Sequence, residues 1–141
     1  MVWRTGTSVD GVRAIEQVFT RLKQRSGGAA FGFLTVGAPT MDLQVGSGVR
    51  RELARVLKVY GPDIGAAAIV YEGLGFKATI VRSVVTAIAL TSHNQFPYRV
   101  FAGVDPAMQW LAGKVAGVTH DVITAVRESS LRSIPGVPTS R

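Results

Sequence analysis

The fold prediction starts from Ala66-Ala67-Ala68-Ile69-Val70-Tyr71, a continuous apolar run that precedes Glu72-Gly73-Leu74-Gly75. A second apolar run extends from Ala29 to Val36 and is bounded by glycine and proline. Apolar runs of this length without alternation are typical of strands buried on both faces. We therefore expect residues 29–36 and 66–71 to form adjacent parallel strands with helices on both faces.

Helical periodicity flanks these runs. Val12, Ile15, Phe19 and Leu22 recur at the spacing of one helix face, and Ser26-Gly27-Gly28 ends that helix.

A second helical pattern lies between the two apolar runs. Ser47 is its predicted N-cap, and Gly61-Pro62 is its predicted end. Its apolar face is predicted to comprise Val49, Leu53, Val56, Leu57 and Tyr60.

Further elements follow the second run. We expect a third helix over residues 76–91, a strand over Tyr98–Ala102 and a helix that Asp105 caps, with Pro106 at its first position. Thr119 is expected to cap a last helix. We expect a short first strand at residues 2–5, which either runs antiparallel at a sheet edge or lies in the centre of the sheet.

The chain has 141 residues and 47% hydrophobic content, which fits one domain. We expect an α/β domain over residues 1–132 and a flexible tail over residues 133–141, which contain two prolines. The lack of cysteine excludes disulfides, thiolate zinc sites and cysteine nucleophiles. No stretch has the length of a membrane span, and no signal-peptide core follows Met1, so we expect a cytoplasmic protein.

The order of strands and helices resembles that of STAS-like regulatory domains, the class that includes anti-sigma-factor antagonists, and in particular their bacterial relatives of unassigned function. Four segments carry the likeness: residues 31–36, 68–76, 98–102 and 107–111. The resemblance implies a mainly parallel or mixed sheet of about four strands flanked by helices. It also implies a regulatory role through protein–protein interaction.

The chain departs from that family at the phosphorylation switch. In STAS antagonists a partner kinase phosphorylates a serine after a strand end. The corresponding turn here reads Glu72-Gly73-Leu74-Gly75 and has no hydroxyl, while Ser83 lies later in the expected helix. We therefore expect a docking domain without this switch.

The same turn is the candidate cofactor-binding site, through Glu72, Gly73 and Gly75. Glycines between a strand and a helix let backbone N–H groups approach an anion. The turn lacks the full dinucleotide fingerprint and the phosphate-loop lysine, so we interpret it as structural and expect no cofactor. Small-molecule or nucleotide binding, including an enzyme, is the alternative function.

The histidines, His93 and His120, do not form a ligand pattern with neighbouring carboxylates, so we expect no metal. No nucleophile motif supports a catalytic triad, and no catalytic residue is predicted.

The predicted partner-binding residues are Arg51, Arg55 and Lys58, on one side of the second helix, and Trp3. The chain has 16 Lys and Arg against 9 Asp and Glu, a net charge of +7. Such a surface is either solvated or attracts an acidic protein. A basic nucleic-acid-binding protein is the second alternative, but the interleaved aromatics typical of that class are missing.

The other large aromatics, Phe101 and Trp110, are expected in the core. The sequence thus predicts a non-enzymatic, STAS-like interaction domain with a protein partner, an acidic one being favoured, and with self-association open.

Overall fold

The computed structural model describes residues 2–3, 8–37, 45–71, 79–80, 82–83, 86–87, 90 and 96–132, without the side chains of residues 2–3, 127 and 129–132. Strands and helices alternate along the chain. The strands are β1 (Val2–Trp3), β2 (Phe31–Gly37), β3 (Ile64–Tyr71) and β4 (Tyr98–Phe101). The helices are α1 (Val9–Ser26), α2 (Ser47–Tyr60), the 3₁₀ turn η1 (Gly61–Asp63), α4 (Val104–Ala112) and α5 (His120–Arg132). Residues 79–80, 82–83, 86–87 and 90 are also helical.

The sheet has the order β1-β2-β3-β4, and each neighbouring pair is parallel. This confirms the predicted α/β class, and β2 and β3 are the adjacent parallel strands expected from the two apolar runs. The two-residue β1 pairs with the end of β2. It lies at a sheet edge but runs parallel, so neither placement considered from the sequence is correct.

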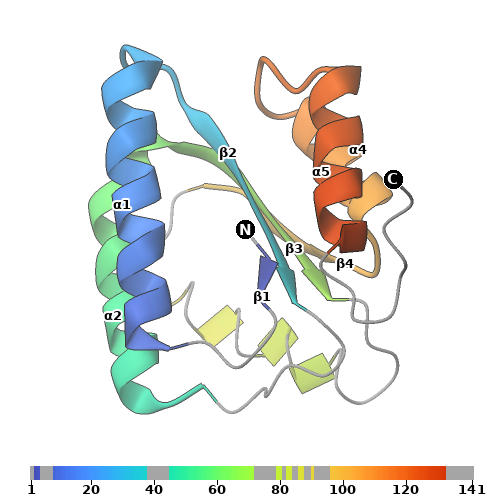
Figure 1. Ribbon diagram of the computed structural model, residues 1–141. Helices are drawn as coiled ribbons and strands as arrows, with labels where there is room; N and C mark the ends of the chain where they lie inside the picture. The colour runs from blue at the N-terminus through green and yellow to red at the C-terminus, as the bar shows by residue number, and fades with distance from the viewer. Residues whose placement is uncertain are drawn as a thin grey trace.

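Helices cover the sheet on both sides, as predicted (Figure 1). Helices α1 and α2 lie on one face, and α4 and α5 on the other. Each face has its own apolar core. The α1–α2 core includes Val12, Ile15, Phe19, Val56 and Ile64, and the α4–α5 core includes Val36, Val70, Val104, Met108 and Leu111.

Helix α1 follows the predicted pattern except near its end. The Ser8 hydroxyl caps the helix by accepting a hydrogen bond from Gly11 N at 3.1 Å. Gly27 ends it in the left-handed conformation, with φ of 58°, where a side chain would be strained. Val12, Ile15 and Phe19 are buried, whereas Leu22, predicted on the same helix face, is 37% exposed.

Two predicted caps are shifted. Ser47 is the first residue of α2 rather than its N-cap. The cap is Gly46, whose carbonyl accepts the Arg50 N–H at 3.0 Å. Asp105 was expected to cap α4, but the extended residue at its start is Gly103, so Asp105 and Pro106 lie inside the first turn. Proline is tolerated there because the first turn leaves its N–H groups without helical partners.

The cap of α5 and the end of α2 agree with the sequence. Thr119 Oγ1 accepts a hydrogen bond from Val122 N at 3.4 Å. Helix α2 ends at Tyr60, where Gly61 and Pro62 begin the 3₁₀ turn.

Strand β3 contains one residue more than the stretch of β2 beside it. Phe31 pairs with Ile64, whereas Gly32 pairs with Ala66, so Gly65 is the extra residue. Side chains alternate between faces along a strand, and the extra residue shifts that alternation. Ile64 therefore joins the α1–α2 core, while Ala66 joins the α4–α5 core. A Cβ at position 65 would lie only 3.2 Å from Val115 Cγ2.

Candidate functional site

The predicted basic side of α2 faces away from the sheet. Val49, Val56 and Leu57 are buried, whereas Arg51 and Lys58 are exposed. The helical phase predicted for α2 is therefore correct. Long cations on this outer side are available to a partner without any rearrangement of the core.

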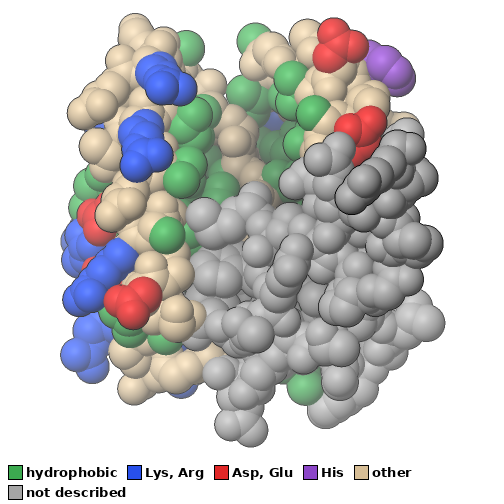
Figure 2. Space-filling model, viewed as in Figure 1, with side chains coloured by type: hydrophobic (Ala, Val, Ile, Leu, Met, Phe, Trp, Pro, Cys, Tyr) green, Lys and Arg blue, Asp and Glu red, His purple; other side chains and the backbone are tan. Residues whose placement is uncertain are grey.

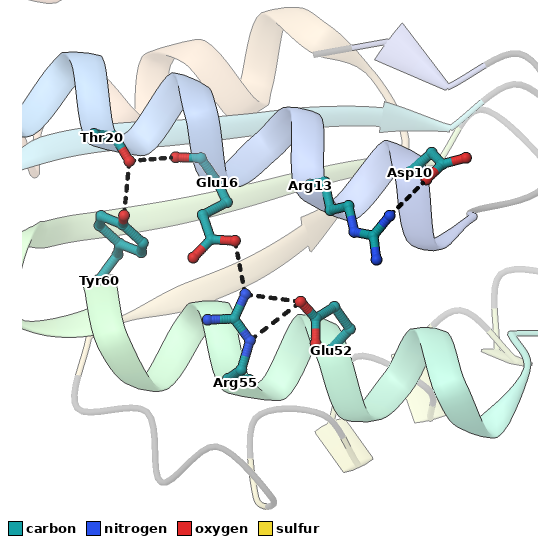
Figure 3. Close-up of polar contacts among 7 residues, drawn as sticks. All are labelled: Asp10, Arg13, Glu16, Thr20, Glu52, Arg55 and Tyr60. Atoms are coloured by element: carbon teal, nitrogen blue, oxygen red, sulfur yellow. Dashed lines mark hydrogen bonds and ion pairs between the residues drawn. The ribbon is translucent and has the colours of Figure 1, made fainter.

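Arg55 differs from its neighbours because carboxylates of the same chain bind it (Figure 3). Its Nε and Nη2 donate to Glu52 Oε1 at 3.1 and 2.7 Å, within α2. Its Nη2 also donates to Glu16 Oε2 at 2.7 Å, on α1. The structure thus assigns Arg55 a role in joining the two helices, and its charge is already balanced.

The same contacts shift the titration of these groups. The hydrogen bond from Arg55 lowers the pKa of Glu52 below its ordinary 4.5, and the charges of Arg55 and Arg13 add to this effect. Hydrogen bonds to Glu52 and Glu16 raise the pKa of Arg55. Glu52 and Arg55 therefore remain charged at neutral pH.

A second polar link joins α1 and α2 one turn further along (Figure 3). Thr20 Oγ1 donates to the Glu16 carbonyl at 2.9 Å. Since that hydroxyl has a single proton, the Tyr60 hydroxyl, 2.7 Å away, donates to Thr20. Near the end of α1, Lys23 Nζ lies 2.8 Å from Oδ2 of Asp63, in the 3₁₀ turn η1 that follows α2.

These links fix the relative direction of the two helices. The linked residues are separated in sequence by 39, 40 and 40 positions. A nearly constant separation means that α1 and α2 run side by side in the same direction. The outer side of α2 is consequently held on a defined two-helix layer.

We define the basic surface as Arg50, Arg51 and Lys58, which are all exposed. Within the described ranges, no carboxylate forms an ion pair with any of them, whereas Arg13 pairs with Asp10 at 3.2 Å. Figure 2 shows Lys and Arg side chains gathered over the α1 and α2 side of the molecule, at the left.

Several candidate residues lie outside the described part of the chain. These are Glu72, Gly73, Gly75, His93 and the side chain of Trp3.

Other candidates can be placed. His120 is exposed at the start of α5. Across the residues that the structure describes, no three His, Cys, Asp or Glu side chains gather into a metal-binding group. Ser83 is exposed, and its hydroxyl donates to the Thr79 carbonyl at 3.1 Å.

Arg99 is a further exposed cation that was not predicted as a site residue. Its guanidinium carbon lies 5.4 Å from the centre of the Phe101 ring, a cation–π distance. Phe101 in turn contacts Trp110, with ring centres 5.7 Å apart, and both rings pack against the α4–α5 core as expected. The available signal was the two-residue spacing of Arg99 and Phe101, which places them on one face of a strand.

Comparisons with known proteins gave no match, whether to a protein-family model, a curated protein or a solved structure. Among the described helices, none combines the length and apolar character needed to cross a membrane.

Proposed function

We propose that this chain is a non-enzymatic, STAS-like protein-interaction domain that docks an acidic partner on its basic surface. The observation that carries the proposal is the contrast along α2. Arg55 is bound by Glu16 and Glu52, whereas Arg51 and Lys58 point outward, and no described carboxylate pairs with them.

The electrostatics of this arrangement suit protein docking. Arg51 and Lys58 are two helical turns apart on a layer that the Arg55 and Tyr60 contacts hold in place. Exposed cations on a rigid support attract an acidic surface and orient it during association.

The STAS-like assignment is supported by the alternation of strand and helix that suggested it. The proposed domain has about four strands, is cytoplasmic and has no phosphorylation switch, because residues 72–75 contain no hydroxyl.

The proposal is tested by charge reversal after a partner has been isolated from native lysate and identified by mass spectrometry. Arg51→Glu with Lys58→Glu should slow association at low salt by about tenfold. Lys114→Glu is the matched control, because Lys114 is exposed after α4 on the other side of the sheet. Equal rates for wild type and the double variant would refute the proposal. Salt-dependent binding of arbitrary duplex DNA, lost in the same variant, would favour the nucleic-acid alternative.

A further inference from the structure

The outer edge of β2 is only partly covered. Strand β1 pairs with β2 at Val36 and Gly37 alone, and Figure 1 shows it beside the lower end of β2. Along the part of the chain that the structure describes, no strand lies beside Phe31, Gly32 and Phe33 on that side. An uncovered strand edge presents backbone N–H and C=O groups to an incoming strand.

Helix α1 supplies one apolar wall beside this edge. Glu16 and Thr20 face α2, as their contacts with Arg55 and Tyr60 show. Val18 and Leu22 project from the opposite flank, because the helix turns about 100° per residue.

These two side chains are 41% and 37% exposed. Phe33, at the uncovered edge, is half-buried and meets Phe19 of α1 with ring centres 5.1 Å apart. The exposed apolar surface of Val18, Leu22 and Phe33 is therefore continuous with the α1–α2 core and extends to the edge of the sheet.

The other wall comes from α4, α5 and the turn between them. A Cβ at Gly32 would lie 3.5 Å from Val115 and 3.6 Å from Leu111, so this side of the edge packs against that layer. Val122 of α5 is 42% exposed. Figure 2 shows a hollow between α1 and the α4–α5 layer, with hydrophobic side chains on both sides of it.

We propose that this edge groove, formed by Phe31, Gly32 and Phe33 between α1 and α5, binds an extended apolar segment of a partner protein. The segment adds to the sheet as a strand beside β2, in line with β1. Its side chains alternate between the two apolar walls, so a continuous apolar run is required rather than an alternating one. This inference rests on the proposed function only in taking the chain to be a protein-interaction domain.

Charge complementarity adds an acidic end to the segment. Arg25 lies on the flank of α1 that carries Val18 and Leu22, in the last turn before β2 begins. Neither Arg25 nor the adjacent Arg21 forms an ion pair with a carboxylate in the described ranges. A carboxylate of the segment near Phe31 would pair with these guanidiniums.

The probe for this groove is a displayed library of random peptides about ten residues long, selected on the purified full chain. We expect enriched peptides to share an apolar run with an acidic end. Leu22→Asp should weaken their binding about tenfold or more. Arg25→Glu should weaken it less, and Lys58→Glu on the basic surface should not change it. Circular dichroism verifies that each variant is folded, and Val18→Asp serves as the second groove variant.

Two further measurements examine the strand geometry itself. An enriched peptide has two sets of alternate backbone positions, only one of which faces β2. N-methylation of that set should abolish binding, because it removes the hydrogen bonds to β2. Hydrogen exchange at residues 31–33 should slow in the complex.

The inference is wrong if no peptide is enriched, or if enriched peptides bind the Leu22→Asp and Val18→Asp variants as tightly as wild type. It is also wrong if the chain is a dimer in sedimentation that Leu22→Asp dissociates, since a second copy would then occupy the groove. Loss of binding with Lys58→Glu alone would support the basic surface and overturn the groove.

Discussion

Glu16 of α1 and Arg55 of α2 are 39 residues apart in the sequence, and their side chains meet at 2.7 Å. This ion pair divides the cations of α2 into one that holds the helices together and others that face solvent. The division determines which substitutions disturb the fold and which disturb binding alone.

Reversing Arg55 should destabilise the protein. Arg55→Glu brings a third carboxylate beside Glu16 and Glu52, and like charges at this distance repel. We expect the melting temperature to fall by several degrees. Arg51→Glu with Lys58→Glu is the control, because these side chains are exposed; its melting temperature should stay close to that of wild type. A double reversal as damaging as Arg55→Glu would mean that Arg51 and Lys58 are also structural.

At acidic pH, Glu52 should no longer contribute to the stability of the folded protein. Its pKa is lower in the folded protein than the ordinary 4.5, chiefly because Arg55 donates to it. A lowered carboxyl pKa stabilises the folded state above that ordinary value, and the stabilisation is lost as the pH falls through the folded pKa. Glu52→Gln should therefore melt below wild type near neutral pH, and the difference should vanish in thermal melts well below pH 4.5. A difference that persists in acid would show that charge is not its source.

Burial differs between neighbouring residues of β3. Val70 is fully buried in the α4–α5 core, whereas Ile69 on the other face is half-buried. Val70→Asp should prevent soluble expression, because an unpaired buried charge costs several kcal/mol. Ile69→Asp should give folded protein of reduced stability. Soluble yield and circular dichroism distinguish the two, and a folded Val70→Asp variant would contradict the assigned faces of β3.

A side chain at the extra residue of β3 would be crowded by Val115 and Ala30. Gly65→Ala places a methyl group 3.2 Å from Val115 and 3.3 Å from Ala30. We expect a loss of about 1–2 kcal/mol in denaturant unfolding. Gly48→Ala in α2 is the matched control, because its added methyl group meets nothing within 4 Å. It should stabilise the helix by about 0.5 kcal/mol. Equal changes in the free energy of unfolding at the two positions would show that crowding at Gly65 does not affect stability.

Much of the fold could be predicted because it depends on local patterns. The two apolar runs gave the central strands, and the spacing of Val12, Ile15 and Phe19 gave the buried face of α1. Leu22 shares the predicted apolar face but is more exposed than Val12, Ile15 and Phe19, because the apolar stripe continues past the edge of the sheet that covers it. Periodicity reports which side of a helix is apolar, but not how far the neighbouring layer extends.

The candidate site was predictable only in part. The phase of α2 placed Arg51 and Lys58 on the outside, as the structure has them. The proximity of Arg55 and Glu52 could be read from their three-residue spacing. The role of Glu16 could not, because it depends on α1 and α2 lying in parallel at one particular register.

The extra residue at Gly65 also constrains how the chain can change in length. Deleting it would restore strict alternation along β3 and leave Ile64 on the side of Phe19, because Ile64 and Ala66 already face opposite cores. A one-residue deletion between Ala66 and Val70 would instead turn part of β3 to the opposite face. A correct alignment with a chain that has regular strands therefore places its gap at this glycine.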